Sequence, residues 1–269
     1  MLILLLFYYF IIRYFYTNNN NYIFFKLKKN INLNVNQIVD LPIYYINLDS
    51  SYERFFSFNS QVNKCNIPQN QIKKISAIDG KILDLSSLTN KIITKNQNTL
   101  LIACLLSHIK AIQTAYNDLC EYAIIMEDDC NFEYIQYQNY KLSDIANLYG
   151  EFYNVIQLAL MATEKTNKKL RMTQTFIKPG YRDSCAAYII NRKGMKNVLN
   201  AFSNKNMELN VADITIYEFA QKCCHLTKPY FTYHYSKKLS TTLIESNSKN
   251  KYEDDSKLFW DKYYKIKIE

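Results

Sequence analysis

Glycine and proline are scarce in this chain of 269 residues, which contains only four of each. Each of them is therefore expected to mark a particular turn. The seven cysteines form no CxxC pair, and Cys223-Cys224-His225 lacks the ligand spacing of a structural zinc site. Several cysteines fall within apolar runs, so we expect buried free thiols.

The usual signals of nucleic-acid binding are also missing. The chain has no zinc-finger spacing, no RNP motif and no long block of lysine and arginine, and its basic residues are scattered. The net charge of +9 still predicts anionic partners. A nucleotide diphosphate or an anionic membrane surface fits that charge, and nucleic acid is not expected as a partner.

The N-terminal residues 1–16 are all apolar or aromatic except for Arg13. This stretch is shorter than the roughly 20 residues of a membrane-spanning helix, and it lacks the basic start of an ordinary signal peptide. We expect a signal-anchor segment that associates the protein with a membrane; the alternative is a hydrophobic leader on a cytoplasmic protein. No N-x-Ser/Thr sequon occurs, which disfavours a glycosylated luminal location but leaves the side of the membrane open.

The remaining chain divides by composition into three parts. Residues 17–40 are rich in Asn and Lys and predict a linker, and residues 246–269 form a charged tail. Between them, residues 41–245 alternate strand-like and helix-like segments, which predicts an α/β Rossmann-type sandwich with a mostly parallel central sheet flanked by helices. The expected strands are 43–48, 72–76, 122–126, 153–160, 186–190 and 230–235, and the expected helices are 99–119, 141–149, 192–202 and 211–221.

One further helix is expected after the first strand. Ser50-x-x-Glu53 has the spacing of a capping box, and Pro68 must lie beyond the end of the helix that it begins. Asn47 and Asp49, at the end of the preceding strand, could bond nucleoside hydroxyls, and Arg54 could meet a diphosphate as a bidentate donor. The alternative makes Ser50 an ordinary cap and Arg54 a solvated helix residue.

The most informative run is Tyr122-Ala-Ile-Ile-Met-Glu127-Asp128-Asp129, in which apolar residues give way to three carboxylates. Such a run predicts a buried parallel strand, and ligands of α/β sheets gather at the carboxyl ends of strands. Three crowded carboxylates repel one another unless a cation lies among them, and oxygen ligands suit Mg²⁺ or Mn²⁺. An acidic surface turn is the alternative.

Six motifs occur in a fixed order along the chain: Ile46–Arg54, Ala77–Gly80, Cys104–His108, Ile125–Asp129, Ala186–Gly194 and the late Asp213. Together they resemble glycosyltransferase family 25, the lipopolysaccharide and collagen β-galactosyltransferase type. The resemblance covers about residues 42–245. Two departures stand out: Ala103 replaces a glycine, and Ser184-Cys185-Ala186-Ala187 replaces a more glycine-rich turn.

The resemblance implies a GT-A-like fold, Mn²⁺ (or Mg²⁺) as cofactor, a UDP-hexose donor and a hydroxyl acceptor on a glycan, a lipopolysaccharide-like or a collagen-like substrate. If the reaction inverts, Asp213 would be the base; otherwise it is an acid favoured by a helix dipole. Asp128, Asp129 and His234, with His225 as the alternative to the last, would be the metal ligands. The donor-binding residues would be Asn47, Asp49, Arg54, Ala77, Asp79, Ser107, His108 and Glu127.

For single residues of this set, a purely structural role remains an alternative. Asp79-Gly80 alone is a common turn, and a lone helical histidine such as His108 is more often a hydrogen-bonded core residue. Two other functions also remain open for the whole chain: a catalytically inactive relative that binds sugars or acts as a scaffold at a membrane, and a metal-dependent phosphoester hydrolase or nuclease that uses the same acids.

Overall fold

The structure is a computed structural model, and it describes residues 33–88, 91–93, 98–160, 177–181, 184–204 and 207–233. The predicted N-terminal segment 1–16 and the tail 246–269 lie outside these residues. Of the predicted linker 17–40, residues 33–40 are described. They include the short helix α2 (Val35–Ile38), and they place Ile38 and Val39 in the core.

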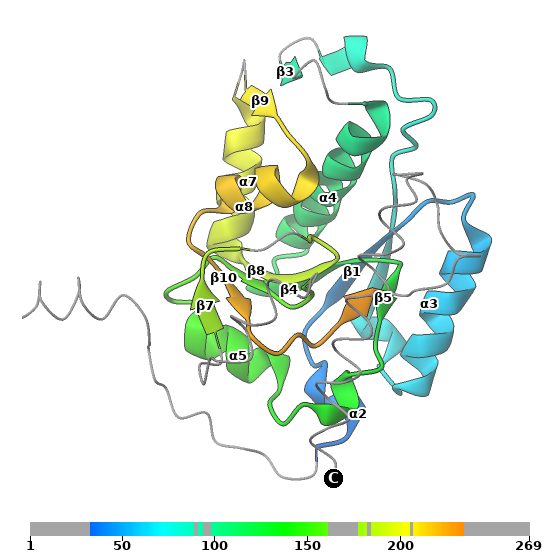
Figure 1. The fold of residues 1–269 in the computed structure, drawn as a ribbon, viewed down its shortest axis with the longest axis vertical. Coiled ribbons are helices and arrows are strands. Elements are labelled where there is room, and N and C mark those ends of the chain that lie inside the picture. The colour runs from blue at the N-terminus through cyan, green and yellow to red at the C-terminus, as the bar shows by residue number, and fades with distance from the viewer. Residues whose placement is uncertain are drawn as a thin grey trace, which may run out of the picture.

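A seven-stranded sheet in the order β2-β1-β4-β8-β6-β10-β7 forms the centre of the fold (Figure 1). Strands β2, β1, β4, β6 and β10 point one way, and β8 and β7 run against them. The predicted α/β sandwich is confirmed. The strands are β1 (Ile43–Asn47), β2 (Ile72–Ser76), β4 (Tyr122–Glu127), β6 (Val155–Gln157), β7 (Ile177–Pro179), β8 (Ala187–Asn191) and β10 (Cys223–Leu226).

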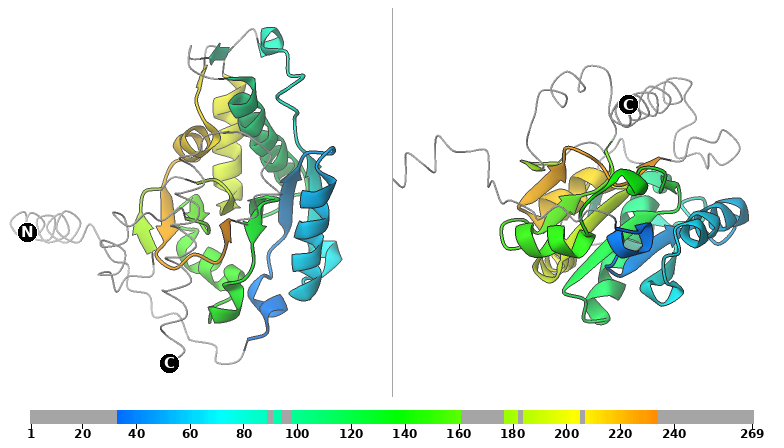
Figure 2. Two further views of the ribbon diagram at one scale, coloured as in Figure 1. Left: turned by 45° about the vertical axis from the view of Figure 1, so that its right-hand side comes forward. Right: turned by 90° about the horizontal axis from the view of Figure 1, so that it is seen from below.

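Helices cover both faces of this sheet (Figure 2). One face packs against α4 (Thr99–Asn117), α7 (Arg192–Ser203) and α8 (Ala212–Ala220). The other face packs against α2, α3 (Tyr52–Lys64) and α5 (Leu142–Tyr149). Smaller elements complete the fold: the pair β3 (Lys91–Ile93) and β9 (Met207–Leu209), the pair β5 (Cys130–Asn131) and β11 (Thr232–Tyr233), and 3-10 turns at Gln69–Gln71, Leu85–Leu88 and Ile135–Tyr137.

The apolar run of β4 shows why the sheet is buried on both faces. Successive side chains of a strand point to opposite faces, so Ile124 and Met126 join one core cluster while Ala123 and Ile125 join the other. Continuous apolar residues are what a doubly covered strand requires. The same geometry brings the end of β4, with its three acids, to the edge of the sheet next to the end of β1.

Helix α4 follows the predicted spacing and packs into the core through Ile102, Leu105, Ile109 and Ile112. Within the described ranges it is the one helix with the length and apolar composition to cross a membrane. Over half of its most apolar stretch, 56%, is buried inside the protein. That burial is accounted for by its packing on the sheet, α7 and α8.

The predicted capping box at the start of α3 does not form. Ser51, not Ser50, is the N-cap residue, and its side chain makes no capping hydrogen bond. The Ser51 N–H donates to the carbonyl of Leu48 at 2.8 Å, which closes a turn and delays the helix by one residue. Glu53 is therefore one position too early to bond back to the cap.

Two strands on the far side of the sheet were not predicted. β10 has only the four residues Cys-Cys-His-Leu, and β7 has three, so neither is long enough to show an alternating pattern. The predicted strand 153–160 is shorter than expected, ending as β6 at Gln157. The predicted extended segment 230–235 contributes β11, which pairs with β5 rather than with the main sheet.

Gly194 provides a test of the packing between α7 and the sheet. A Cβ atom there would lie 2.8 Å from the backbone carbonyl oxygen of Asn154 and 3.0 Å from Ile190 Cγ1. Helix propensity alone predicts that Gly194→Ala stabilises the protein by about 1 kcal/mol. We expect the clash to dominate and to lower the free energy of unfolding by about 1–3 kcal/mol.

The measurement is urea unfolding of Gly194→Ala beside Lys193→Ala, an exposed position in the same turn of α7. The control should differ from the parent chain by only a few tenths of a kcal/mol. A Gly194→Ala protein as stable as the parent would show that α7 can shift away from Asn154.

Candidate functional site

A cavity of about 310 Å³ opens at the carboxyl ends of β1 and β4. Its walls come from the start of α3, the loop after β2 and the first turns of α4. Ligands of open α/β sheets bind at such an edge, and the volume is at the lower end of those of small-molecule sites. Seven of the residues predicted as site residues line the cavity: Arg54, Ala77, Asp79, Ser107, His108, Glu127 and Asp128.

The other predicted residues lie elsewhere. Asn47 is buried behind Asp128, and Asp49 is exposed on the outer side of β2. The Asp49 carboxylate pairs with Lys74 Nζ at 2.6 Å and accepts a hydrogen bond from Ser76 Oγ at 3.0 Å. These contacts hold it away from the cavity.

Of the two histidines considered as late metal ligands, the structure describes only His225. His234 lies outside the described residues. His225 is buried in β10 with its Nδ1 3.0 Å from the carbonyl oxygen of Gly180. Strand β10 is separated from β4 by β6 and β8, a distance of roughly 14 Å at the usual strand spacing.

One cation already balances the acids after β4. Arg54 Nη2 forms ion pairs with Asp128 Oδ1 and with Asp129 Oδ2, the second at 2.9 Å. The amide of Asn47 donates to Asp128 Oδ2 at 2.7 Å. Burial raises the pKa of Asp128, and Arg54 and Asn47 oppose that shift. The sequence predicted Mg²⁺ or Mn²⁺ among these carboxylates, and in the structure the guanidinium of Arg54 meets two of them.

The donor set of Asp128 and Asp129 fits a hard divalent cation. Both residues offer carboxylate oxygens, as Mg²⁺ and Mn²⁺ prefer, and the guanidinium between them marks a place that attracts positive charge. An ion bound there would share these oxygens with Arg54 or replace it.

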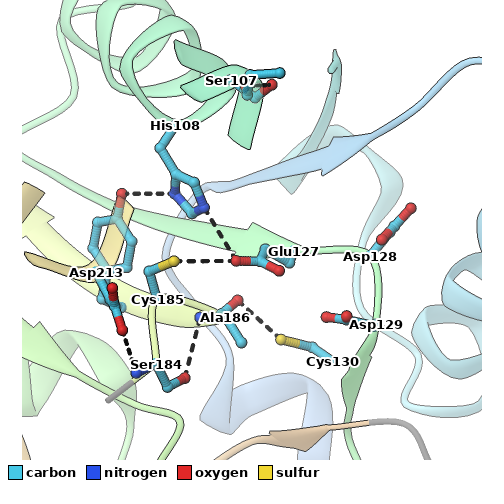
Figure 3. Close-up of polar contacts among 12 residues, drawn as sticks. Ser107, His108, Glu127, Asp128, Asp129, Cys130, Ser184, Cys185, Ala186 and Asp213 are labelled. Carbon is cyan, nitrogen blue, oxygen red and sulfur yellow. Dashed lines mark hydrogen bonds and ion pairs between the residues drawn. The ribbon is translucent and has the colours of Figure 1, made fainter. Parts of the chain in front are cut away.

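A second cluster lies beside the first, on the other side of Glu127 (Figure 3). His108, fully buried, contacts Glu127 Oε1 through Nε2 at 3.2 Å and the hydroxyl of Tyr188 through Nδ1 at 3.1 Å. The thiol of Cys185 donates to the same Oε1 atom at 3.2 Å. Burial alone would lower the pKa of His108, but Cys104 and Glu127 outweigh it and raise the pKa to about 10.

Cys104, His108, Glu127 and Cys185 bring one ligand atom each to within 4.8 Å of one another, so the group could hold a metal ion. Sequence reasoning placed the metal ligands among the acids after β4 and a late histidine, and it missed both thiols of this group. The available signal was the spacing of Cys104 and His108, which puts both on one face of a helix. Nothing in the sequence tied Cys185 to them. All seven cysteines lie in described residues and are free thiols, as predicted.

The loop after β2 is fixed to α4 by two motif residues. Ser107 Oγ accepts a hydrogen bond from the Ile78 N–H at 2.8 Å and donates to the Ala103 carbonyl at 2.6 Å. A Cβ atom on Gly80 would lie 2.6 Å from Leu100 Cα, so only glycine allows this approach. The predicted turn at Asp79-Gly80 thus forms one wall of the cavity.

Asp213 stands on the far side of Glu127 from Asp128 (Figure 3). It lies in the first turn of α8 and accepts a hydrogen bond from the Ser184 N–H at 3.4 Å. Its other oxygen accepts from the Ile214 N–H at 3.0 Å. Asp213 is not among the residues that line the cavity.

Comparison with known proteins places these residues in a family pattern. The model of glycosyltransferase family 25 (LPS biosynthesis protein) matches residues 40–216. That range spans β1 to the first half of α8, and it includes every residue that lines the cavity. A comparison with curated proteins finds no match.

The ion pairs of Arg54 predict a large effect on stability. Arg54→Ala would leave Asp128, only 6% exposed, without its charged partner. Loss of one partner of a buried ion pair costs about 3–5 kcal/mol, and we expect a loss of roughly 3 kcal/mol in the free energy of unfolding. Urea unfolding measures it.

Arg54→Lys and the double variant Arg54→Ala/Asp128→Asn serve as controls. The lysine keeps one charge, and the asparagine removes the charge left unpaired, so both should be more stable than Arg54→Ala. If Arg54→Ala unfolds within about 0.5 kcal/mol of the parent chain, as surface substitutions do, the ion pairs contribute no net stability.

Proposed function

This chain belongs to glycosyltransferase family 25 and is therefore a glycosyltransferase, and we propose that it moves a hexose from a UDP-sugar to a hydroxyl acceptor. Galactose and glucose are the proposed sugars, and a glycan, a lipopolysaccharide-like or a collagen-like molecule is the proposed acceptor. The proposal includes inversion at the sugar and dependence on Mn²⁺ or Mg²⁺. It also keeps the membrane as a partner, through residues 1–16.

The observation that carries the proposal is the position of Arg54 on the cavity wall. Its guanidinium lies between two carboxylates and faces a space lined by Ser50 and Ser51 at the start of α3. Helix N-termini and arginine side chains are the groups that bind phosphate oxygens in proteins. A diphosphate in this cavity would compete with Asp128 and Asp129 for the same guanidinium.

The predicted donor residues divide into two kinds. Ala77 and Asp79 line the cavity and could touch the donor directly. His108 and Glu127 also line it, and they would act on the donor by shaping the cavity wall, because His108 Nε2 contacts Glu127 Oε1. Asn47 acts through Asp128, to which it donates a hydrogen bond. Ser107 lines the cavity and also positions its wall, whereas Asp49 is bound to Lys74 and Ser76 outside the cavity and is left out of the proposed donor site.

Asp128 and Asp129 are the residues that would hold a Mn²⁺ or Mg²⁺ ion, which would supply positive charge to the leaving diphosphate. The chain's own contribution is electrostatic. Arg54 would turn from the acids to the diphosphate, and Asn47 would keep Asp128 oriented while Arg54 does so. His234 remains a proposed further ligand.

The donor is tested by thermal unfolding with UDP-galactose, UDP-glucose, UDP-GlcNAc and UDP-xylose, each with and without Mn²⁺. We expect one hexose donor and Mn²⁺ together to raise the melting temperature by more than the sum of their separate effects, since a ligand that binds only the folded state stabilises it. The absence of any nucleotide-dependent shift would contradict the proposal.

The same samples separate the alternatives when UDP release and phosphate-ester cleavage are also measured. A catalytically inactive relative would show the shift without Mn²⁺-dependent UDP release. A phosphoester hydrolase would cleave p-nitrophenyl phosphate or nucleic acid and would show no preference for UDP-sugars.

Asp213 is the proposed base that removes the acceptor proton. A positioned base contributes about 10²–10⁴-fold to a rate. We therefore expect Asp213→Asn to lower UDP release in the presence of acceptor by about 100-fold or more, with the UDP-sugar thermal shift unchanged. Asp144→Asn is a matched control, because Asp144 is also partly buried in the first turn of a helix, α5, away from the cavity. Full activity of Asp213→Asn would remove this assignment.

A further inference from the structure

We propose that Cys104, His108, Glu127 and Cys185 form a zinc site between α4 and the ends of β4 and β8. The site is distinct from the pair Asp128 and Asp129, and it does not depend on the identity of the sugar donor. The four side chains converge in the structure, and the chemistry of their ligand atoms identifies zinc as the ion that they would bind.

The ligand atoms match zinc in both type and spacing. The group offers two sulfur atoms, one imidazole nitrogen and one carboxylate oxygen, all within 4.8 Å of one another. Ligand atoms around a tetrahedral zinc ion lie about 3.3–3.8 Å apart, as follows from bonds of about 2.0–2.3 Å. Glu127 Oε1 already lies 3.2 Å from His108 Nε2 and 3.2 Å from Cys185 Sγ. Small movements of side chains would close the group around an ion.

The kind of ligand distinguishes this group from the acids on the opposite side of Glu127. Thiolates are soft ligands that select zinc over Mg²⁺ and Mn²⁺, whereas the carboxylates of Asp128 and Asp129 favour the harder ions. Four protein ligands leave no open position, which is typical of structural rather than catalytic zinc sites. We therefore assign the ion a structural role at the cavity wall.

The surroundings orient the ligands before an ion arrives. Cys104 and His108 are one turn apart on α4, and His108 Nδ1 is 3.1 Å from the hydroxyl of the buried Tyr188. That contact directs Nε2 toward the group, as partners of metal-bound histidines commonly do. Glu127 and Cys185 are held together by the backbone, since the Glu127 N–H donates to the Ala186 carbonyl at 2.7 Å.

The family motifs contain three of the four ligands, Cys104, His108 and Glu127, and Cys185 completes the group. Cys185 lies in the segment 184–187, where the chain departs from the glycine-rich turn of the pattern that it otherwise resembles. Without Cys185 the remaining three ligands would leave a position open. A disulfide between Cys104 and Cys185 is the competing use of the two thiols, and the experiment has to separate the two.

The test uses the full-length chain, reduced and freed of metal, and titrated with Co²⁺ as a spectroscopic substitute for Zn²⁺. We expect one Co²⁺ per chain to give the visible bands of tetrahedral cobalt and the near-ultraviolet charge-transfer bands of thiolate ligands, whereas a second Co²⁺ at Asp128 and Asp129 would add only weak octahedral bands. Added Zn²⁺ should displace the cobalt and raise the melting temperature.

Four variants identify the ligands. Cys104→Ser and Cys185→Ser should abolish the charge-transfer bands and weaken Zn²⁺ binding by more than the roughly 10–100-fold typical of an outer-shell partner. Cys223→Ser is the matched control for Cys185, because the two thiols are 9% and 8% exposed, and it should bind as the parent does. Asp129→Asn should also bind as the parent does, because Asp129 belongs to the other cation site.

Alkylation of the parent chain keeps the test valid if a variant does not fold. Zn²⁺ should protect Cys104 from iodoacetamide and should not protect Cys65, which is also partly buried. The proposal is overturned if cobalt gives only the weak spectrum of octahedral coordination, if Cys185→Ser keeps the thiolate bands, or if the reduced chain shows no zinc protection. A failure of these tests leaves the UDP-sugar tests of the proposed function unaffected.

Discussion

The site depends on one electrostatic constraint at the end of β4, where Asp128 and Asp129 follow a strand whose four central residues are buried. Buried carboxylates are costly unless a positive group meets them, so Arg54 has to reach both. Because Arg54 lies in the first turn of α3, this requirement places the start of that helix beside the end of β4. The cavity is the space that this arrangement leaves between α3, the loop after β2 and α4.

Glu127 divides two positively charged environments. On one side the guanidinium of Arg54 balances two carboxylates, and on the other side His108 meets the Glu127 carboxylate among thiols. The first environment has only oxygen ligands, and the second mixes sulfur, nitrogen and oxygen. A hard ion such as Mg²⁺ or Mn²⁺ would therefore prefer the first site, and a softer ion such as Zn²⁺ would prefer the second.

Much of the fold could be predicted from the sequence because its central strands carry continuous apolar runs. The apolar runs of β1 and β4 are long enough to indicate buried strands. The apolar residues of α4 recur at helical spacing over 19 residues, which indicates a helix. Strand β10 has four residues, too few for a pattern, and its place in the sheet depends on pairing with β6. The failed capping box has a different cause, since a local turn between Leu48 and Ser51 decides where α3 begins.

Site residues that belong to one short sequence motif could be predicted, whereas contacts between residues far apart in the sequence could not. The acids after β4 and the arginine of α3 were visible as motifs, and the structure brings Arg54 and Asp128 together. The convergence of Cys104 and Cys185 depends on how α4 packs across the ends of β4 and β8. The spacing of Cys104 and His108 within α4 indicates that these two residues lie together. No local pattern in the sequence indicates that Cys185 joins them.

Several motif residues hold other parts of the site in place. Asn47 orients Asp128, Ser107 anchors the loop after β2, and Gly80 allows that loop to touch α4. A motif set of this kind describes how the cavity is built as much as what it binds. Lys81 and Leu100 line the same cavity beside Gly80 but lie outside the motifs, so the motif set describes only part of its wall.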